Sequence, residues 1–390
     1  SSSLWSAFLP LLPFMGMVFV GLTATGMALP VVPRHVHDTL GQGTVVVGLV
    51  MGAQYLSSVF ARLWAGSTAD TRGARLAVLC GLAASCGVGL LYLGSVHAAA
   101  GPGAALGWVF AARLLTGVAE SFLVTGAMAW ASARLGPAHT GKVIGWIGMA
   151  VFAGLGASAP LGTAVHAGFG FGGVAAAVLL TALGALAFTS RVAGVLPSAL
   201  PKLPPLRVLG AVRLPGLGLT LCSLGFAMIT AFAVLLFVQR GWGGGALAVT
   251  SMGVGFIAAR LLFGHLPDQA GGARVALASV LVEALGLALI WLAAHPAAAW
   301  AGAALVGGGY GLAFQGLGVE AVRRAPPQSR GSAMGAYIVF QDLAMGLAPP
   351  LGGLLAASAG LDAVYLAAAL GALASAWVAW ILLRMDRAGP

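Results

Sequence analysis

Twelve apolar stretches of about 20 residues each follow one another along the chain, separated by short polar segments. Each stretch is long enough to cross roughly 30 Å of hydrocarbon as a helix. Lipid offers no partner for an open strand edge, so the spanning backbone must be helical. The pattern predicts an all-α membrane protein with spans near 8–32, 45–66, 76–97, 106–130, 142–166, 172–194, 215–239, 246–266, 275–295, 299–321, 333–357 and 362–383.

An internal repeat divides these spans into two sets of six. The segment ARLWAGSTADTRGAR at 61–75 returns as ARLLFGHLPDQAGGAR at 259–274, with equivalent residues offset by 198, and a second block is offset by 190. An even number of spans per repeat gives both halves the same orientation, which predicts two six-helix bundles related by a pseudo-two-fold axis along the membrane normal. We expect bundles at 1–196 and 214–390, joined by a proline-rich, basic cytoplasmic linker at 197–213.

The basic residues sort by side of the membrane. Of the 19 lysines and arginines, 14 lie in the loops after even-numbered spans or in the C-terminal tail. Under the positive-inside rule this places both termini in the cytoplasm. The net charge of +10 therefore reflects topology, and we expect lipid as the surrounding partner and no nucleic acid.

The segment GSTADTRGAR at 66–75 resembles the cytoplasmic signature of the major facilitator superfamily, Gly-x-x-x-Asp-x-x-Gly-x-Arg, and GHLPDQAGGAR at 264–274 resembles its second-half copy. In the first half, LPVVPRHVHDTLG and VVGLVMGAQYL are similar to a bacterial group of arabinose-efflux-permease-like exporters. The resemblance implies a multi-pass protein of the bacterial inner membrane that moves a small solute by alternating access.

The repeated signature supplies candidates for cytoplasmic gating. Carboxylates near helix N-termini and arginines in the loops can form a network that stabilises one state and breaks in the other. A loop needed only for topology is the alternative. The candidates are Gly66, Asp70, Gly73, Arg75, Asp268, Gly271 and Arg274.

Acids within the spans are candidates for proton coupling, because a charge in hydrocarbon costs about 2.5–3.5 kcal/mol on insertion scales. Glu120 lies near the middle of the fourth span, seven residues after Arg113 and on the same helical face, and Asp342 lies in the eleventh span. Arg113 and Gly117 fit the family's Arg-x-x-x-Gly element, whose arginine is implicated in proton coupling. For Glu120 and Asp342 the alternative is a permanently paired ion or a hydrogen-bonding anchor between helices. At Glu283, a third acid within a span, we expect a structural or neutral acid.

Other polar groups at mid-helix depth are candidates for solute contact, although interhelical hydrogen bonding is at least as good an interpretation of each. They are Gln54, Tyr55, Tyr310, Gln315 and Gln341. The segment GLGASAPLG at 154–162 partly resembles a glycine-proline signature of antiporters, and plain helix packing explains it equally well. His35, His37 and Asp38 lie together at the periplasmic mouth, but we expect neither a metal site nor a cofactor.

We predict a proton-driven exporter of a small organic solute, sugar-like or amphiphilic, that works as an antiporter and as a monomer. A symporter importing its solute is the near alternative, and a receptor or scaffold on the same fold is a third. No ATP-binding loop, Gly-x-Ser-x-Gly or His-Glu-x-x-His occurs in the sequence, so we do not expect an enzyme.

Overall fold

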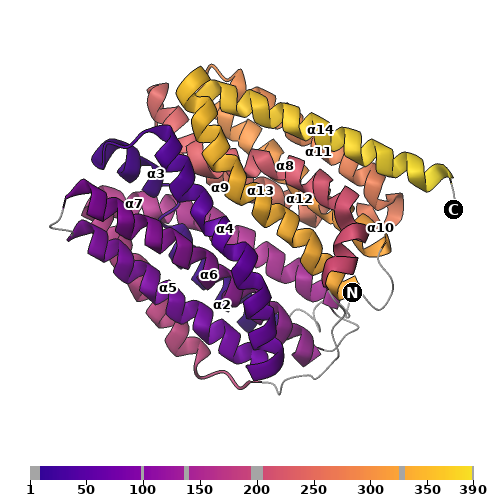
Figure 1. Cartoon of the computed structure of the whole chain (residues 1–390), viewed down its shortest axis with the longest axis horizontal. Helices are drawn as coiled ribbons and strands as arrows, with labels where there is room; N and C mark the ends of the chain where they lie inside the picture. Colours follow the sequence, from indigo (N-terminus) through magenta and orange to yellow (C-terminus); the bar gives the residue numbers. More distant parts are fainter. Residues whose placement is uncertain (1–8, 98–100, 136–139, 195–204, 325–329, 389–390) are drawn as a thin grey trace. The chain divides into compact units, whose positions relative to one another are not determined.

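The computed structural model describes residues 9–97, 101–135, 140–194, 205–324 and 330–388, and these residues contain helices and no strand (Figure 1). Five elements are short, namely η1 (Leu9–Leu11), α3 (Val32–Arg34), η2 (His35–Thr39), η3 (Ala69–Gly73) and α10 (Leu266–Ala270). The longer helices are α2 (Leu12–Gly26), α4 (Thr44–Thr68), α5 (Ala74–Val96), α6 (Pro102–Leu135), α7 (Thr140–Thr189), α8 (Pro205–Gln239), α9 (Ala246–Phe263), α11 (Gly272–Trp291), α12 (Pro296–Arg324), α13 (Arg330–Ala359) and α14 (Leu361–Ala388).

These helices account for the twelve predicted spans. Ten helices in the described part of the chain are long and apolar enough to cross a membrane. One of them, α7, is broken at Gly170 (φ 64°, ψ −167°), between the spans predicted at 142–166 and 172–194. The break divides α7 into two spans, and the shorter apolar helix α2 adds one more. The predicted all-α membrane fold is confirmed.

The helices group into two compact units. The described residues of 9–42 and 53–194 form one unit, and those of 43–52 and 205–388 form the other, so the first turns of α4 group with the second unit. Helix α8 begins at Pro205, which makes 205–213 helical within the segment assigned to a linker, and residues 195–204 lie outside the described part. The division at 1–196 and 214–390 stays a prediction.

Small residues let the helices of the first unit approach closely. There α2 packs against α7, and α5 packs against α6 and α7. A Cβ atom at Gly154 would lie 2.8 Å from the Phe19 carbonyl oxygen, and one at Gly162 would lie 2.0 Å from that of Met27. The Thr23 hydroxyl donates to the Gly154 carbonyl oxygen at 3.4 Å. Close helix packing therefore gives the glycine-proline segment 154–162 a structural role.

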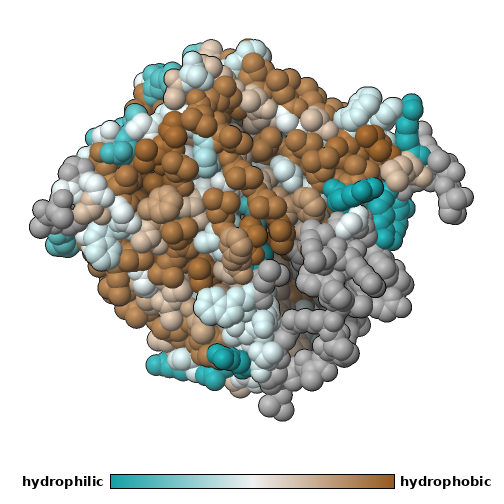
Figure 2. Space-filling view, viewed as in Figure 1, coloured by the Kyte–Doolittle hydropathy of each residue, from teal (hydrophilic) through white to brown (hydrophobic). Residues whose placement is uncertain are grey.

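The second unit is built around α8, α11 and α12. Helix α11 packs against α12 and α14, α12 packs against α9, and α8 packs against α13 and α14. Large apolar side chains face outward from both units, among them Phe169 at 79% exposure and Leu262 at 64%. Hydrophobic residues cover most of the face drawn in Figure 2. Exposed apolar surface on this scale belongs to a protein surrounded by lipid.

Two repeat-related glycines adopt the same unusual backbone conformation. Gly73 precedes α5 with φ 104° and ψ 141°, and Gly271 precedes α11 with φ 92° and ψ 139°. L-residues rarely enter this region, so each turn requires glycine. The repeat seen in the sequence is therefore also a repeat of local structure.

We expect Gly73→Ala and Gly271→Ala each to destabilise the protein by about 1–3 kcal/mol, the typical strain of a disfavoured backbone conformation. At Gly271 nothing lies within 4 Å of an added Cβ atom, so the loss there arises from the backbone alone. Thermal unfolding of purified protein in detergent measures the effect. Gly66→Ala is the matched control, because Gly66 lies within helix α4 and an added Cβ atom there also meets nothing. Equal losses in all three variants would contradict the explanation.

Candidate functional site: a polar cluster around Glu120

Three helices of the first unit meet at the carboxylate of Glu120, which α6 carries at mid-length. The Thr25 hydroxyl on α2 donates to Oε1 at 3.0 Å, and the Gln54 side-chain amide on α4 donates to Oε2 at 2.6 Å. Both donor residues are buried, and Glu120 is half-buried. Each carboxylate oxygen thus binds one neutral donor from a different neighbouring helix.

Arg113 lies on the same helix, seven residues before Glu120, and its side chain is 1% exposed. It is the main cation acting on the Glu120 carboxylate, followed by Arg62 on α4. Two of its guanidinium donors, Nε and Nη2, are buried without a hydrogen-bond partner in the described part of the chain. Tyr92 of α5 lies beside Arg113 and is fully buried. The cluster therefore combines an acid, a cation and spare hydrogen-bonding capacity inside an apolar bundle.

Close contact between α4 and α6 positions Gln54 against Glu120. A Cβ atom at Gly117 would lie 1.9 Å from the Gln54 carbonyl oxygen and 2.1 Å from Ser57 Oγ. The Ser57 hydroxyl donates to the Leu114 carbonyl oxygen at 2.7 Å, and the Ser58 hydroxyl donates to that of Gly117 at 3.3 Å. The glycine of the Arg-x-x-x-Gly element is thus a point where the two helices approach closely.

The remaining solute candidates are not gathered at this cluster. Gln315 donates to the Gly264 carbonyl oxygen at 3.4 Å, at the end of α9, which is an interhelical hydrogen bond. Tyr310 is buried among aromatic rings, with the Phe226 centroid at 5.5 Å. Tyr55 is half-buried on α4, and Gln341 is half-buried on α13 beside the buried Asp342. Of the predicted residues, the structure brings together Glu120, Arg113 and Gln54, and roles for the others stay predictions.

The gating candidates lie at helix ends. An Arg75 guanidinium nitrogen donates to the Ser190 carbonyl oxygen, just after the end of α7, where a cation complements the helix dipole. Arg274 is exposed at the start of α11, and Gly66 is half-buried in α4. The side chains of Asp70 and Asp268 lie outside the described part of the chain. The proposed latch therefore stays a prediction.

Glu320, near the end of α12, is a buried carboxylate that was not among the residues predicted from the sequence. Its side chain is 1% exposed and forms ion pairs with Arg323, at 2.8 Å, and with Arg324. Its Oε1 also accepts a hydrogen bond of 3.1 Å from the backbone nitrogen of Ala273, in the first turn of α11. The spacing of one acid followed by arginines three and four residues later was the available signal. Glu320 ties α12 to α11 and is a further candidate for the gating network.

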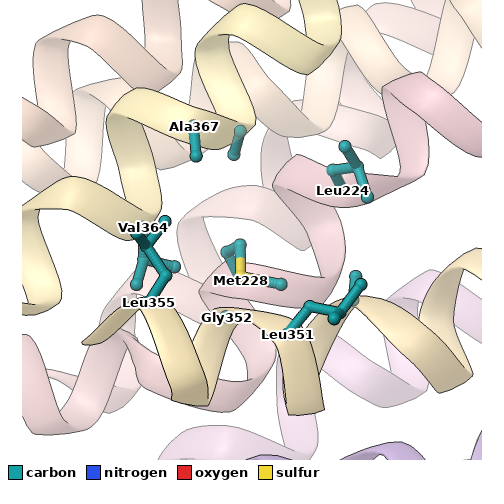
Figure 3. Close-up of a pocket in the computed structure, with 9 residues that line it drawn as sticks. Leu224, Met228, Leu351, Gly352, Leu355, Val364 and Ala367 are labelled. Atoms are coloured by element: carbon teal, nitrogen blue, oxygen red, sulfur yellow. The ribbon is translucent and has the colours of Figure 1, made fainter. Parts of the chain in front are cut away.

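Two cavities in the second unit are apolar. One of about 180 Å³ lies between α8, α13 and α14, where Leu224, Met228 and Leu351 are among the lining residues (Figure 3). The other, a groove of about 480 Å³, lies between α9, α11 and α12. A solute site needs a few convergent polar groups to fix its ligand, which the smaller cavity lacks.

His35 and His37 have separate surroundings. The His35 ring stacks on Phe171 with centroids 3.9 Å apart, whereas His37 Nδ1 lies 2.8 Å from the Gln42 carbonyl oxygen. In the described part of the chain no group of three acidic, histidine or cysteine residues is placed to hold a metal ion. Burial, with a smaller contribution from nearby His166, lowers the pKa of His35 to about 4.

We predict that stability falls as the pH drops from about 6.5 to about 4, because unfolded His35 binds a proton in this window and the folded residue does not. Thermal unfolding measured across this range checks the expectation. His35→Phe keeps a ring against Phe171 and should remove the part of this pH dependence of stability that is due to His35. His37→Gln, at an exposed position, should keep the pH dependence of the wild type. The same pH profile in both variants would refute the assignment.

We expect Gly117→Ala to destabilise the protein by about 1–3 kcal/mol, the usual penalty for overpacking, because the new methyl group collides with the backbone of α4. The shift also separates Gln54 from Glu120. Gly107→Ala on the same helix is the control, since a Cβ atom there meets nothing within 4 Å. Thermal unfolding compares the two variants, and equal stability would show that α4 and α6 do not pack as described.

The chain matches the family model of the Major Facilitator Superfamily over residues 14–347 and 217–390. It is 40% identical over 367 residues to an uncharacterized MFS-type transporter of Salmonella typhimurium, covering 94% of this chain and 95% of the relative. A similar protein of Pseudomonas aeruginosa is 40% identical over 379 residues, with 95% and 92% covered.

Solved structures share the fold at low sequence identity. The nucleoside transporter NupG matches with a TM-score of 0.76 and 15% identity, covering 96% of this chain and 99% of that one. The human organic anion transporter MFSD10 matches with a TM-score of 0.67 and 18% identity, covering 95% and 99%. The fold, the family model and the relatives agree, and the chain belongs to the major facilitator superfamily of membrane transporters.

Proposed function

We propose that this protein is a proton-coupled antiporter that exports a small organic solute, sugar-like or amphiphilic, by alternating access. The observation that carries the proposal is the Glu120 carboxylate, which binds donors from α2 and α4 and lies near a buried arginine. An ionisable group inside a membrane bundle is a functional candidate because its burial is costly. We place the protein in the bacterial inner membrane as a monomer. The distribution of basic residues supports an orientation with both termini cytoplasmic.

Proton binding at Glu120 changes how the helices are held. The ionised carboxylate accepts two charge-assisted hydrogen bonds, which are roughly twice as strong as neutral ones. A proton on either oxygen removes the charge and weakens the bonds from Thr25 and Gln54. Protonation therefore loosens α2 and α4 from α6, and a change of state becomes less costly.

Exchange follows if proton and solute compete for the same carboxylate. Solute hydroxyl or amine groups replace Thr25 and Gln54 as donors most favourably while Glu120 is ionised, because a proton turns one of its acceptor sites into a donor. A proton arriving from one side then displaces the solute, and solute arriving from the other side displaces the proton. Asp342, buried on α13, is our candidate for a further coupling acid.

Cytoplasmic gating would use the repeated signature. The turns at Gly73 and Gly271 fix where α5 and α11 begin. We propose that Asp70, Arg75, Asp268 and Arg274, with Glu320, hold the cytoplasmic helix ends in one state of the cycle. Breaking these bonds would shift the population toward the other state.

One observation favours symport as the second candidate. Nε and Nη2 of Arg113 form one edge of the guanidinium and have no partner in the described part of the chain. Such an edge suits an acceptor group of a solute. A solute bound there would be favoured when Glu120 is protonated, so proton and solute would travel together.

The test uses purified protein in liposomes that contain a pH dye, with a panel of candidate solutes. Wild type should couple solute movement to proton movement, and Glu120→Gln should abolish the pH signal while solute exchange persists, because glutamine preserves an acceptor for Thr25 and Gln54. Asp342→Asn should weaken the pH signal if that acid takes part. The direction of the pH change distinguishes antiport from symport.

Asp38→Asn is the matched control, because Asp38 is an exposed acid outside the spanning helices. It should leave the pH signal unchanged. A pH signal that survives in Glu120→Gln would refute the coupling role. Solute exchange without any pH signal in wild type would indicate a uniporter, and no exchange with any solute would favour a receptor or scaffold.

A further inference from the structure

A further acid, Glu283, is buried in the other unit, and the cluster around Glu120 gives it no role. Glu283 lies in the middle of α11 and is 0% exposed. Both of its carboxyl oxygens are buried without a hydrogen-bond partner in the described part of the chain. We expected a structural or neutral acid at this position, but a structural acid would hold a neighbouring helix through a hydrogen bond.

The neighbours of Glu283 are small, apolar or weakly polar. A Cβ atom at Gly225 on α8 would lie 2.9 Å from Glu283 Oε1, and one at Gly309 on α12 would lie 2.7 Å from its backbone nitrogen. On α8 the Cys222 thiol lies close enough to be affected by a charge on Glu283. Ser375 of α14 lies beside Cys222 and donates to the Gly218 carbonyl oxygen at 2.8 Å. No charged group of the described residues faces this carboxyl from α8, α12 or α14.

These surroundings determine the charge state of the Glu283 carboxyl group. An isolated carboxylate in an apolar interior is too costly to persist, so the group takes up a proton and becomes neutral. The neutral acid still leaves an O–H donor without an acceptor, which carries the desolvation penalty of an unsatisfied polar group. Glu283 therefore does not stabilise the packing of these helices through a hydrogen bond. Its position suits an acid whose proton is used in another state of the protein.

We propose that Glu283 is a further proton-binding site, held as the neutral acid between α8, α11, α12 and α14 in this state and releasing its proton when these helices separate. The proposal rests on the proton-coupled transport proposed above. The step breaks the carboxyl O–H bond, passes the proton to water and leaves a carboxylate. No other co-reactant is required.

A groove lies beside this part of α11. The groove of about 480 Å³ is lined by Ser279 and Val282, four and one residues before Glu283, and by Gly309 from α12. Its lining also includes Arg274, at the start of α11. A small rearrangement of α12 against α11 would open the carboxyl to this groove, because glycine at position 309 leaves no side chain between them.

Infrared difference spectroscopy of the full chain in lipid membranes tests the proposal directly. The spectrum of wild type minus that of Glu283→Gln isolates the C=O stretch of this carboxyl, and glutamine preserves its size. We expect the band of a protonated acid near neutral pH and its reversible loss in more alkaline buffer. A band that persists at every pH would identify a permanent structural acid, and an absent band would show an ionised carboxylate; either result overturns the proposal.

Labelling with dicyclohexylcarbodiimide provides an independent measurement, because this apolar reagent reacts with protonated carboxyl groups in membranes. Mass spectrometry should locate the adduct at Glu283 in wild type, with less adduct in alkaline buffer, and Ser279→Ala should label like wild type. In the liposome assay, Glu283→Gln should reduce the pH signal per solute moved without abolishing exchange. An unchanged signal with Glu283→Gln, alongside a lost signal with Glu120→Gln, would refute this inference and leave the proposed function standing.

Discussion

The absence of water from hydrocarbon is the constraint on which the rest of this structure depends. Every backbone N–H and C=O group in a span must find its partner inside its own helix. Helix association then relies on close packing, because lipid is as apolar as the side chains it would replace. Glycine and serine supply that packing, as at Gly117 and Ser57, where α4 and α6 come together.

Under the same constraint, a polar side chain inside the bundle either has a hydrogen-bonding or ionic partner or costs free energy to bury. Glu120 is accommodated by donors from two other helices, so its ionised form has partners. Glu283 has none in the described part of the chain, so its neutral form is the one the site accepts. Glu120 and Glu283 thus lie in opposite environments, and we infer that they take and release protons at different points in the cycle.

Length and periodicity were enough to predict the helices, because a span needs a fixed number of apolar residues and little else. The offset of 198 predicted that Gly73 and Gly271 would be equivalent, and both turns have the same geometry. The start of α8 at Pro205 was missed, since proline-rich sequence reads as a linker although proline is tolerated in the first turn of a helix. The exact ends of helices depend on such local residue preferences, whereas the existence of a span depends mainly on its length and hydrophobicity.

The candidate site was only partly predictable. Arg113 and Glu120 share a helical face, which spacing alone reveals. Their partners lie on other helices, as Thr25 is 95 residues from Glu120 and Gln54 is 66 residues away. Glu320 was missed for the same reason, because its contact with Ala273 joins residues 47 apart in sequence. Contacts between helices depend on rotation and register, which no local pattern specifies.

Comparison of the two repeats shows what has been kept and what has changed. The glycine turns are the same, but at an offset of 190 Glu120 corresponds to Tyr310 and Trp130 corresponds to Glu320. At an offset of 198 Glu283 corresponds to Ser85, whose hydroxyl donates to the carbonyl oxygen one turn earlier at 3.0 Å. The two repeats therefore share their helical framework but carry their acids at different positions along the helices. Because an acid responds to protons only when its own surroundings open, we infer that the two units respond to the proton gradient differently.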